Sequence, residues 1–118
     1  RSLVRSFSRA ADLNGDYYCY SCGSCQRARE KTTIVEPLPR ALIIQLKRFP
    51  FDGSDRKIDT FVHYEMEYRN LISNNDRYQL SAVLIHNGSL SGGHYTAVTK
   101  HPHSGRWYRY NDSHVQEI

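Results

Sequence analysis

The sequence lacks any long apolar run, and it contains few cysteines. None of its 118 residues belongs to an apolar stretch of the length that a membrane span requires, and no apolar segment typical of a signal peptide opens it. We therefore expect no membrane partner. The three cysteines, Cys19, Cys22 and Cys25, lie within seven residues. An odd, tightly spaced set is a poor disulfide framework and favours metal binding in a reducing compartment, the cytoplasm or the nucleus.

Clustered positive charge is also missing, although the formal net charge is +4. The two densest basic groups, QRARE and LKRF, are interrupted by acidic or apolar residues. The sequence contains no RNA-recognition signature and no glycine–arginine repeat. Scattered, solvated charge explains this balance better than a nucleic-acid groove, so no nucleic-acid partner is expected. The same charge would suit an acidic patch on a protein partner.

Aromatic residues are plentiful: they make up 12% of the chain, nine of them are tyrosines, and they favour β structure. A short amphipathic helix is predicted at the start, ending before the turn dipeptide Asn14-Gly15. Residues 41–49, ALIIQLKRF, alternate most clearly and predict the strongest strand. The predicted fold class is α+β, predominantly antiparallel β. Further extended segments are predicted near 17–20, 61–68, 77–88, 93–99, 106–112 and 115–118.

The segment SLSGGHYTAV, residues 89–98, places a single histidine between paired glycines and a predicted strand. If residues 100–105 connect this strand to the next, Thr99 faces Arg106 and His94 faces Asn111 across an antiparallel hairpin. Facing side chains project to the same side of a sheet, with Cβ atoms about 4.5–5.5 Å apart. An imidazole and a carboxamide at that separation can form a hydrogen bond.

Such a pair has a chemical use. An amide oxygen that accepts a hydrogen bond from Nδ1–H fixes the imidazole tautomer and leaves Nε2 as the base. Because asparagine brings no negative charge, the pair fits a cysteine nucleophile, as in the Cys-His-Asn variant of the catalytic triad. The alternative is a half-buried strand histidine beside a turn asparagine, and the residues alone leave both open. His86, at the end of an apolar strand face, is interpreted as a half-buried histidine with its hydrogen bonds satisfied.

Four segments match one family in the same order along the chain. They are GDYYCYSC, LPRALIIQLKRF, YQLSAVLIHNGSLSGGHYTAV and RWYRYNDSHVQEI. They resemble the second zinc knuckle, the LKRF strand, the GHY block and the closing block of the ubiquitin-specific protease catalytic domain. The resemblance implies that residues 1–118 are the C-terminal part of a papain-like cysteine protease domain. It places part of the zinc-knuckle fingers at about 17–35 and the palm sheet at about 40–118.

The resemblance also implies an activity. The family is a group of thiol-dependent deubiquitinases that hydrolyse the isopeptide or peptide bond after the C-terminal Gly-Gly of ubiquitin. Ubiquitin and ubiquitinated proteins are therefore the expected partners. His94 matches the catalytic base, Asn111 the third triad member, and Asp112 an acidic position that helps to polarise the site. Segments 87–93 and 49–59 match two loops that roof the channel for the ubiquitin tail, and the implied substrate-binding residues are Gly92, Gly93 and Tyr95.

Part of the family's machinery is absent from this sequence. The family's nucleophile lies in a motif of the type G..N.GNTC, whereas every cysteine here lies between positions 19 and 25. The nucleophile is therefore expected outside this chain, and the chain alone is expected to be inactive. Cys19 and Cys22 match one of the two Cys-x-x-Cys pairs that hold structural Zn²⁺ in the family, and Cys25 offers a third thiolate. No organic cofactor is expected.

Two other functions stay open. A non-catalytic ubiquitin-binding or scaffolding module of the same fold would bind ubiquitin without needing His94 or Asn111. A small zinc-knuckle nucleic-acid binder rests only on net charge and the cysteines, and ranks last. A cysteine motif elsewhere in the full-length protein would decide between the first two.

Overall fold

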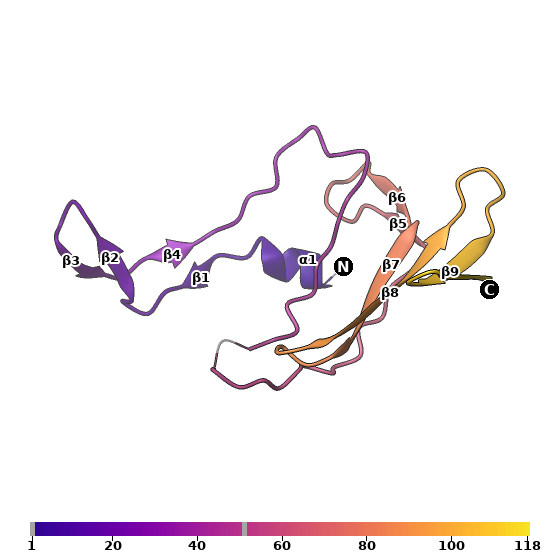
Figure 1. Cartoon of the computed structure of the whole chain (residues 1–118). Helices are drawn as coiled ribbons and strands as arrows, with labels where there is room; N and C mark the ends of the chain where they lie inside the picture. The colour runs from indigo at the N-terminus through magenta and orange to yellow at the C-terminus, as the bar shows by residue number, and fades with distance from the viewer. Residues whose placement is uncertain (1, 51) are drawn as a thin grey trace. The chain divides into compact units, whose positions relative to one another are not determined.

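The computed structural model describes residues 2–50 and 52–118. Over these residues the chain forms a single helix and ten strands, and it divides into two units. The first unit comprises residues up to 40 together with 69–77, and the second comprises 41–68 together with 78–118. No helix in the described ranges is long and apolar enough to cross a membrane. Figure 1 traces the elements from indigo at the N-terminus to yellow at the C-terminus.

The first unit consists of short elements held by local contacts. Its helix α1 (Ser2–Phe7) ends earlier than the sequence predicts. Asn14 and Gly15 take φ angles of 50° and 89°, and the Asn14 N–H donates to Asp12 Oδ1 at 2.9 Å, so the predicted turn is confirmed. Two antiparallel pairs follow, β1 (Ala11–Asp12) with β4 (Arg29–Glu30) and β2 (Tyr17–Cys19) with β3 (Ser24–Gln26).

The strand predicted for residues 41–49 does not form in the described chain, and this prediction was wrong. Ile43 is 90% exposed and Ile44 57% exposed. An alternating apolar pattern favours extended backbone, but a strand also needs a neighbour that bonds its N–H and C=O groups. Among the described residues, such a bond is found near the end of the segment: the Ile58 N–H donates to Arg48 O at 2.7 Å. The Arg48 guanidinium in turn donates to Ile58 O at 3.0 Å.

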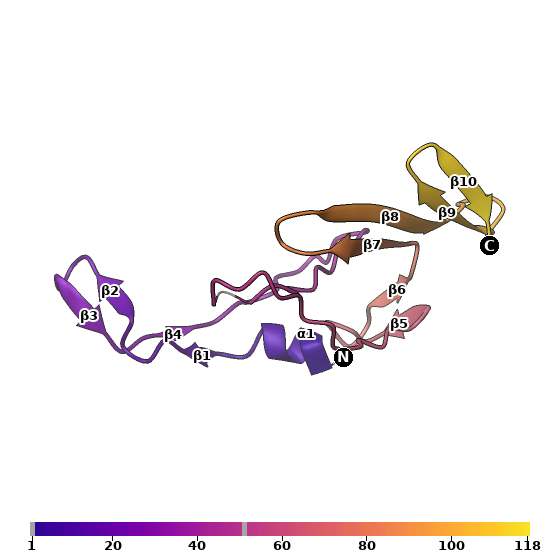
Figure 2. The same ribbon diagram turned by 60° about the horizontal axis from the view of Figure 1, so that its bottom comes forward.

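The second unit contains a four-stranded antiparallel sheet with strand order β10-β9-β8-β7. Figure 2 shows β7 and β8 as a long hairpin that leads into β9 and β10. Each strand is adjacent in space to the next strand in sequence, so short connections suffice. The prediction of an antiparallel β fold with little helix is confirmed for the described residues. The strands are β7 (Ala82–Gly88), β8 (Gly93–Lys100), β9 (Trp107–Asn111) and β10 (His114–Glu117).

The long strand predicted for residues 77–88 is interrupted. β6 (Arg77–Gln79) pairs with β5 (Glu67–Arg69) in a separate two-stranded sheet, and β7 starts at Ala82. At the break, the Leu80 N–H donates to Met66 O at 2.9 Å, and the Lys100 N–H donates to Ser81 O at 2.8 Å. The chain therefore changes partner at Leu80 and Ser81. The extended segment predicted for 61–68 forms a strand only from Glu67 onwards.

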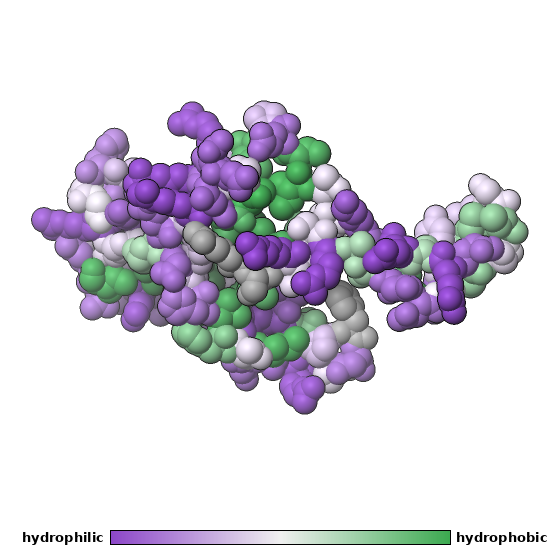
Figure 3. All heavy atoms as spheres, turned by 180° about the vertical axis from the view of Figure 1, so that it is seen from behind, coloured by the Kyte–Doolittle hydropathy of each residue, from purple (hydrophilic) through white to green (hydrophobic). Residues whose placement is uncertain are grey.

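The four-stranded sheet has two distinct faces because successive side chains alternate. The face that carries His94 has a hollow of about 370 Å³. Among the described residues the one buried hydrophobic side chain is Leu71, at 7% exposed, and it lies in the first unit. Many apolar side chains are therefore visible at the surface, as the green spheres of Figure 3 show. The hollow is lined by Tyr64, Met66, Leu80, Val83, Ile85, Val98, Trp107 and Ile118.

Candidate active site

The register of the β8–β9 hairpin corrects the sequence prediction. Thr99 faces Tyr108, not Arg106, so each residue of β8 meets a residue two positions further along than predicted. A shift of two residues keeps every side chain on its face, because the strand repeat is two. His94 and Asn111 therefore still share a face of the sheet, but they meet diagonally.

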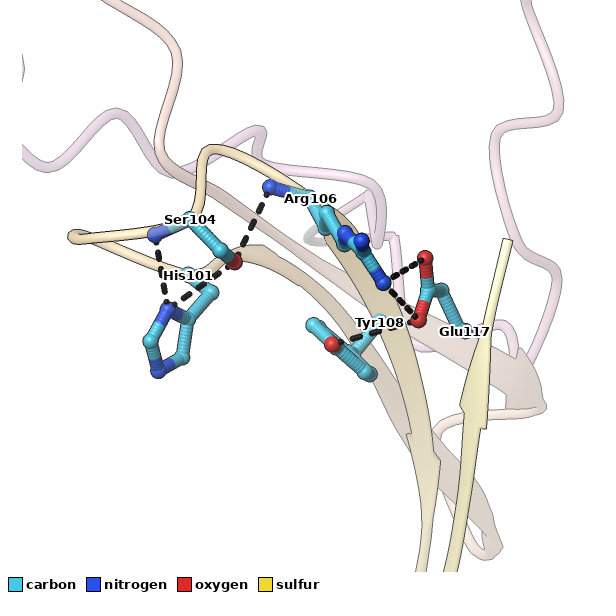
Figure 4. A network of polar contacts seen from close by, with 5 residues as sticks. All are labelled: His101, Ser104, Arg106, Tyr108 and Glu117. Atoms are coloured by element: carbon cyan, nitrogen blue, oxygen red, sulfur yellow. Dashed lines mark hydrogen bonds and ion pairs between the residues drawn. The ribbon is translucent and has the colours of Figure 1, made fainter.

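The connection between the two strands explains this shift. The His101 N–H donates to Arg106 O at 2.7 Å, and the Gly105 N–H donates to His101 O at 2.9 Å, so pairing continues past the predicted end of β8. Inside the loop His101 Nδ1 accepts a hydrogen bond from the Ser104 N–H at 3.1 Å, and Gly105 takes a φ of 72°. Arg106 Nη1 lies 3.2 Å from both carboxylate oxygens of Glu117 on β10 (Figure 4). The connection therefore moves by one residue, from the predicted 100–105 to 101–106, and this moves the pairing by two.

The central contact of the site joins β8 to the end of β9. His94 Nε2 lies 2.6 Å from Asn111 Oδ1. A carboxamide oxygen can only accept a hydrogen bond, so Nε2 carries the proton and donates. The predicted contact between the two side chains is present, but the nitrogen differs from the prediction. Nε2 rather than Nδ1 meets the amide, which leaves Nδ1 as the basic nitrogen of this tautomer.

Asp112 lies beside this pair, in the turn from β9 to β10. Its Oδ2 is 4.0 Å from His94 Nε2, and its side chain is 81% exposed. The residue takes a φ of 50°, a left-handed conformation that aspartate tolerates better than most residues. Because water screens an exposed pair at this distance, Asp112 adds little to the stability of the fold. It does place a carboxylate next to the imidazole.

Gly93, directly before His94, lies under the ring of His86. A Cβ on Gly93 would overlap His86 Nε2 and would come within 2.6 Å of Asn87 O. The His86 ring also packs against Tyr95, with ring centroids 4.6 Å apart. His86 and Tyr95 thus occupy the face opposite His94, as strand alternation predicts. His86 is half-buried, which agrees with the structural interpretation made from the sequence.

The other glycines of this hairpin behave differently from one another. Gly92 has open space where a Cβ would stand, so no described neighbour requires a glycine there. Gly88 takes a φ of 135°, and a Cβ there would overlap Gly92 O. Gly88 is not among the substrate-binding residues predicted from the sequence. No clear signal was available, because a four-residue hairpin loop does not by itself require a positive φ at the strand residue before it.

The structure also adds two charged residues that sequence analysis did not single out, Asp55 and Lys57. The Lys57 ammonium donates to the main-chain oxygen of His86 and lies 3.4 Å from His86 Nδ1. The Asp55 carboxylate bonds to Ser91, 36 residues away in sequence. No local pattern could have revealed these contacts, because they depend on how a loop folds back onto β7 and β8.

The predicted metal ligands Cys19 and Cys22 lie together at the β2–β3 turn. The Cys22 N–H, the Cys22 thiol and the Ser21 N–H bond to the Cys19 sulfur and lower the pKa of Cys19 below its ordinary value. This favours the thiolate, the form that binds metals. Cys25 faces Tyr18 in the β2–β3 pair. Among the described residues, no group of three or more histidine, cysteine or acidic side chains could hold a metal ion. The pair therefore fits half of a tetrahedral zinc site.

Comparison with known proteins places this geometry in a family. The family model described as ubiquitin carboxyl-terminal hydrolase matches residues 15–118. The chain belongs to this family. The match extends from before the cysteine pair to the end of β10, so it includes every site residue named above. The resemblance drawn from the four sequence motifs is thereby confirmed.

Curated members of the ubiquitin carboxyl-terminal hydrolase family match almost the whole chain. Ubiquitin carboxyl-terminal hydrolase 48 of Danio rerio is 36% identical over 126 residues, which cover 98% of this chain and 12% of that protein. Ubiquitin carboxyl-terminal hydrolase 3 of Mus musculus is 36% identical over 129 residues, which cover 98% of this chain and 24% of that protein. The chain thus spans a quarter or less of these two relatives.

Solved structures agree with the family assignment. The SAGA DUB module that contains Ubp8, bound to monoubiquitin, is similar with a TM-score of 0.74 and 31% sequence identity. The similarity covers 99% of this chain and 28% of that one. The same module bound to ubiquitin aldehyde gives a TM-score of 0.69 at 31% identity, covering 99% and 29% of the two chains. The fold is therefore similar to a part, somewhat over a quarter, of the chains in these structures.

Proposed function

We propose that this chain is the histidine-bearing part of a cysteine-type deubiquitinase, which hydrolyses the bond after the C-terminal Gly-Gly of ubiquitin. The observation that carries the proposal is the 2.6 Å contact between His94 Nε2 and Asn111 Oδ1, in a chain of the ubiquitin carboxyl-terminal hydrolase family. Ubiquitin and ubiquitinated proteins are the proposed partners, since two similar structures contain monoubiquitin or ubiquitin aldehyde. A reducing compartment, cytoplasmic or nuclear, is proposed from the closely spaced cysteines.

The geometry supports a definite role for each ring nitrogen. Asn111 Oδ1 holds the Nε2 proton, so Nδ1 can take the proton of a cysteine thiol. The resulting thiolate attacks the carbonyl carbon of the terminal glycine of ubiquitin. His94 then returns the proton to the leaving amine, and water hydrolyses the thioester in a second step. Asp112, with Oδ2 4.0 Å from Nε2, is proposed to help polarise the site.

The nucleophile of this reaction is proposed to lie outside residues 1–118. The apolar hollow and His94 share one face of the sheet, and a surface of this kind on a monomer marks an interaction site. The rest of a catalytic domain, packed on this face, would bury the hollow and bring a cysteine to the edge where His94 stands. Met66 and Ile118, each 56% exposed, would then become part of a core.

Zinc is proposed as a structural ion at the β2–β3 turn. Cys19 and Cys22 would hold it as thiolates, and two further ligands from outside the described residues would complete the tetrahedron. Bound there, zinc would cross-link the turn to the chain that supplies the other ligands. The ion has no step in the hydrolysis proposed above.

A second candidate function is a non-catalytic ubiquitin-binding module of the same fold. It is favoured by one observation: the only cysteines of the sequence lie between positions 19 and 25, in the unit that does not contain His94. Such a module would keep its affinity for ubiquitin after removal of the His94 side chain.

The test uses the full-length protein and a fluorogenic amide of the ubiquitin C-terminus. His94→Ala should lower kcat/KM by at least about 1,000-fold, the order of loss seen when a triad member is removed. His63→Ala is the matched control, because His63 is 71% exposed and contacts only a neighbouring carboxylate in its described ion pair. Normal turnover by the His94 variant would overturn the proposal. Loss of turnover with unchanged ubiquitin affinity is the expected result.

A further inference from the structure

Two loops of the second unit are joined by one carboxylate. We call them loop 52–58 and loop 89–92, the second being the connection between β7 and β8. Asp55 Oδ1 accepts a hydrogen bond from the Ser91 N–H at 3.0 Å, and Asp55 Oδ2 accepts one from Ser91 Oγ at 2.8 Å. The carboxylate therefore engages both donors of a single residue. A bidentate, charge-assisted contact of this kind fixes orientation as well as distance.

A second contact holds the same loop to the strand that precedes loop 89–92. The Lys57 ammonium donates to the main-chain oxygen of His86. Asp55 and Lys57 are two residues apart, and they attach to the two ends of a short segment that runs from His86 to Ser91. The His86 ring packs over Gly93, directly before His94. Both attachments therefore act on the residues that lead into His94.

Loop 52–58 is itself fixed at its base, so it can serve as an anchor. The Ile58 N–H donates to Arg48 O at 2.7 Å. Arg48 Nη1 also donates to Ile58 O at 3.0 Å and to Thr60 O at 2.7 Å. Loop 89–92 has fewer bonds of its own: the Ser89 N–H donates to Gly92 O at 2.8 Å, and the Ser89 and Ser91 hydroxyls are 3.0 Å apart. Asp55 therefore connects an anchored loop to one with few internal bonds.

We propose that Asp55 is a positioning residue, which ties loop 89–92 to loop 52–58 and so holds the approach to His94 in the shape that receives a glycine-ended peptide. This inference rests on the proposed function. Gly92, with open space around it, and Gly93, under the His86 ring, lie between the tie at Ser91 and the base at position 94. When Asp55 releases Ser91, loop 89–92 samples other conformations. The substrate terminus must then order the loop on binding, which raises KM more than it lowers kcat.

The chain supplies a matched control three residues away. Asp52 Oδ1 accepts hydrogen bonds from the Ser54 N–H at 2.9 Å and from Ser54 Oγ at 2.6 Å. The chemistry is that of Asp55 with Ser91, a carboxylate with the amide and hydroxyl of one serine. The two contacts differ in what they connect: the Asp52 contact stays within loop 52–58, whereas the Asp55 contact joins this loop to loop 89–92. An effect of Asp55 that Asp52 does not share therefore comes from the tie between the loops.

Kinetics of the full-length protein test the inference. With the fluorogenic amide of the ubiquitin C-terminus, Asp55→Ala should raise KM about 3- to 10-fold while kcat changes less than about 2-fold, the scale expected for losing a charge-assisted bond. Asp55→Asn, which keeps an acceptor, should fall between Asp55→Ala and wild type. Asp52→Ala, whose lost contact lies within loop 52–58, should raise KM less than Asp55→Ala does. Ser91→Ala should raise KM less than Asp55→Ala, and the double variant should equal Asp55→Ala alone.

Amide hydrogen exchange of the full-length protein provides a readout that does not depend on activity. The Ser91 amide should exchange slowly in wild type and in Asp52→Ala, and faster in Asp55→Ala and, by less, in Asp55→Asn. Equal KM values for Asp55→Ala and Asp52→Ala, or a Ser91 amide that exchanges equally in both, would overturn the inference. Full activity in His94→Ala would instead overturn the proposed function, whatever the exchange rates show.

Discussion

The β2–β3 hairpin and the β7–β10 sheet bring their candidate functional side chains together in different ways. In the hairpin, Cys19 and Cys22 meet because they are three residues apart across one tight turn, in which the Gly23 N–H donates to Cys19 O at 2.8 Å. In the sheet, His94 and Asn111 are 17 residues apart and meet through strand register. Local spacing fixes the first pair, whereas the second depends on where the loop between β8 and β9 begins and ends. The site on the sheet is therefore the more sensitive of the two to changes elsewhere in the chain.

The largest effect on activity is expected when the contact between His94 and Asn111 is removed. Asn111→Ala in the full-length protein should lower kcat by about 100-fold, because the Nε2 proton loses its acceptor and the ring no longer holds one tautomer. Steady-state hydrolysis of the fluorogenic amide measures this. Cys25→Ser, on β3, should leave kcat within about 2-fold of wild type. A variant at position 111 with wild-type kcat would remove the amide from the proposed mechanism.

Substitutions of the cysteines in the β2–β3 hairpin are expected to change the zinc content of the protein. Cys19→Ser and Cys22→Ser should each lower the zinc content of the full-length protein by about one ion per chain, because thiolates supply the strong bonds of such sites. Elemental analysis of the purified protein measures this. Cys25→Ser, outside the proposed pair, should keep its zinc. If zinc is lost from the Cys25 variant and kept in the other two, the ligand assignment is wrong.

Alanine substitutions at the neighbouring glycines Gly92 and Gly93 are expected to differ in their effect on stability. Gly93→Ala should destabilise the full-length protein by about 1–3 kcal/mol, because the new methyl group overlaps the His86 ring and Asn87 O. Gly92→Ala should change stability by less than about 0.5 kcal/mol, since the space around it is open. Thermal unfolding distinguishes them. The double variant Gly93→Ala with His86→Ala should recover part of the loss, and a failure to do so would show that the ring is not the obstacle.

Much of the local structure could be predicted from the sequence, and most of the long-range structure could not. The Asn14-Gly15 turn, the antiparallel strands on either side of KHPHSG and the pairing of Cys19 with Cys22 follow from turn chemistry and alternation. The register of β8 against β9 did not follow, because it depends on bonds between His101, Ser104 and Arg106 within the loop. His94 and Asn111 nevertheless lie on the same face of the sheet, as predicted, because a shift of two residues leaves each side chain on its face.

The strand predicted for residues 41–49 shows a different limit. Its alternation is real, but alternation reports only which side chains tolerate burial, and hydrogen-bond partners decide whether a strand forms. No described strand pairs with this segment, and the side chains of Ile43 and Ile44 are exposed. The hydrogen bonds between Asp55 and Ser91 could not be predicted from the sequence either. They join residues 36 apart in two irregular loops, for which no periodic pattern exists.

The smallest expected effect is the pH dependence of the tie between Asp55 and Ser91. Hydrogen bonds from the Ser91 and Ser89 side chains, and from the amide N–H groups of loop 89–92, lower the pKa of Asp55 below its ordinary value of about 3.9. A lowered pKa means that the tie is fully present above the unfolded value and is lost as pH falls through the folded value. Carboxyl NMR titration should give Asp55 a midpoint below about 3.9. A midpoint at or above that value would contradict the tie.

The central claim is that His94 acts through the proton that Asn111 holds, and a double-mutant cycle tests it most directly. In full-length protein, Asn111→Ala should lower kcat by about 100-fold when His94 is present and by less than about 2-fold when His94 has already been replaced by alanine. The two losses would then be strongly non-additive. Equal losses from Asn111→Ala in both backgrounds would show that the two residues act independently, and would contradict the account.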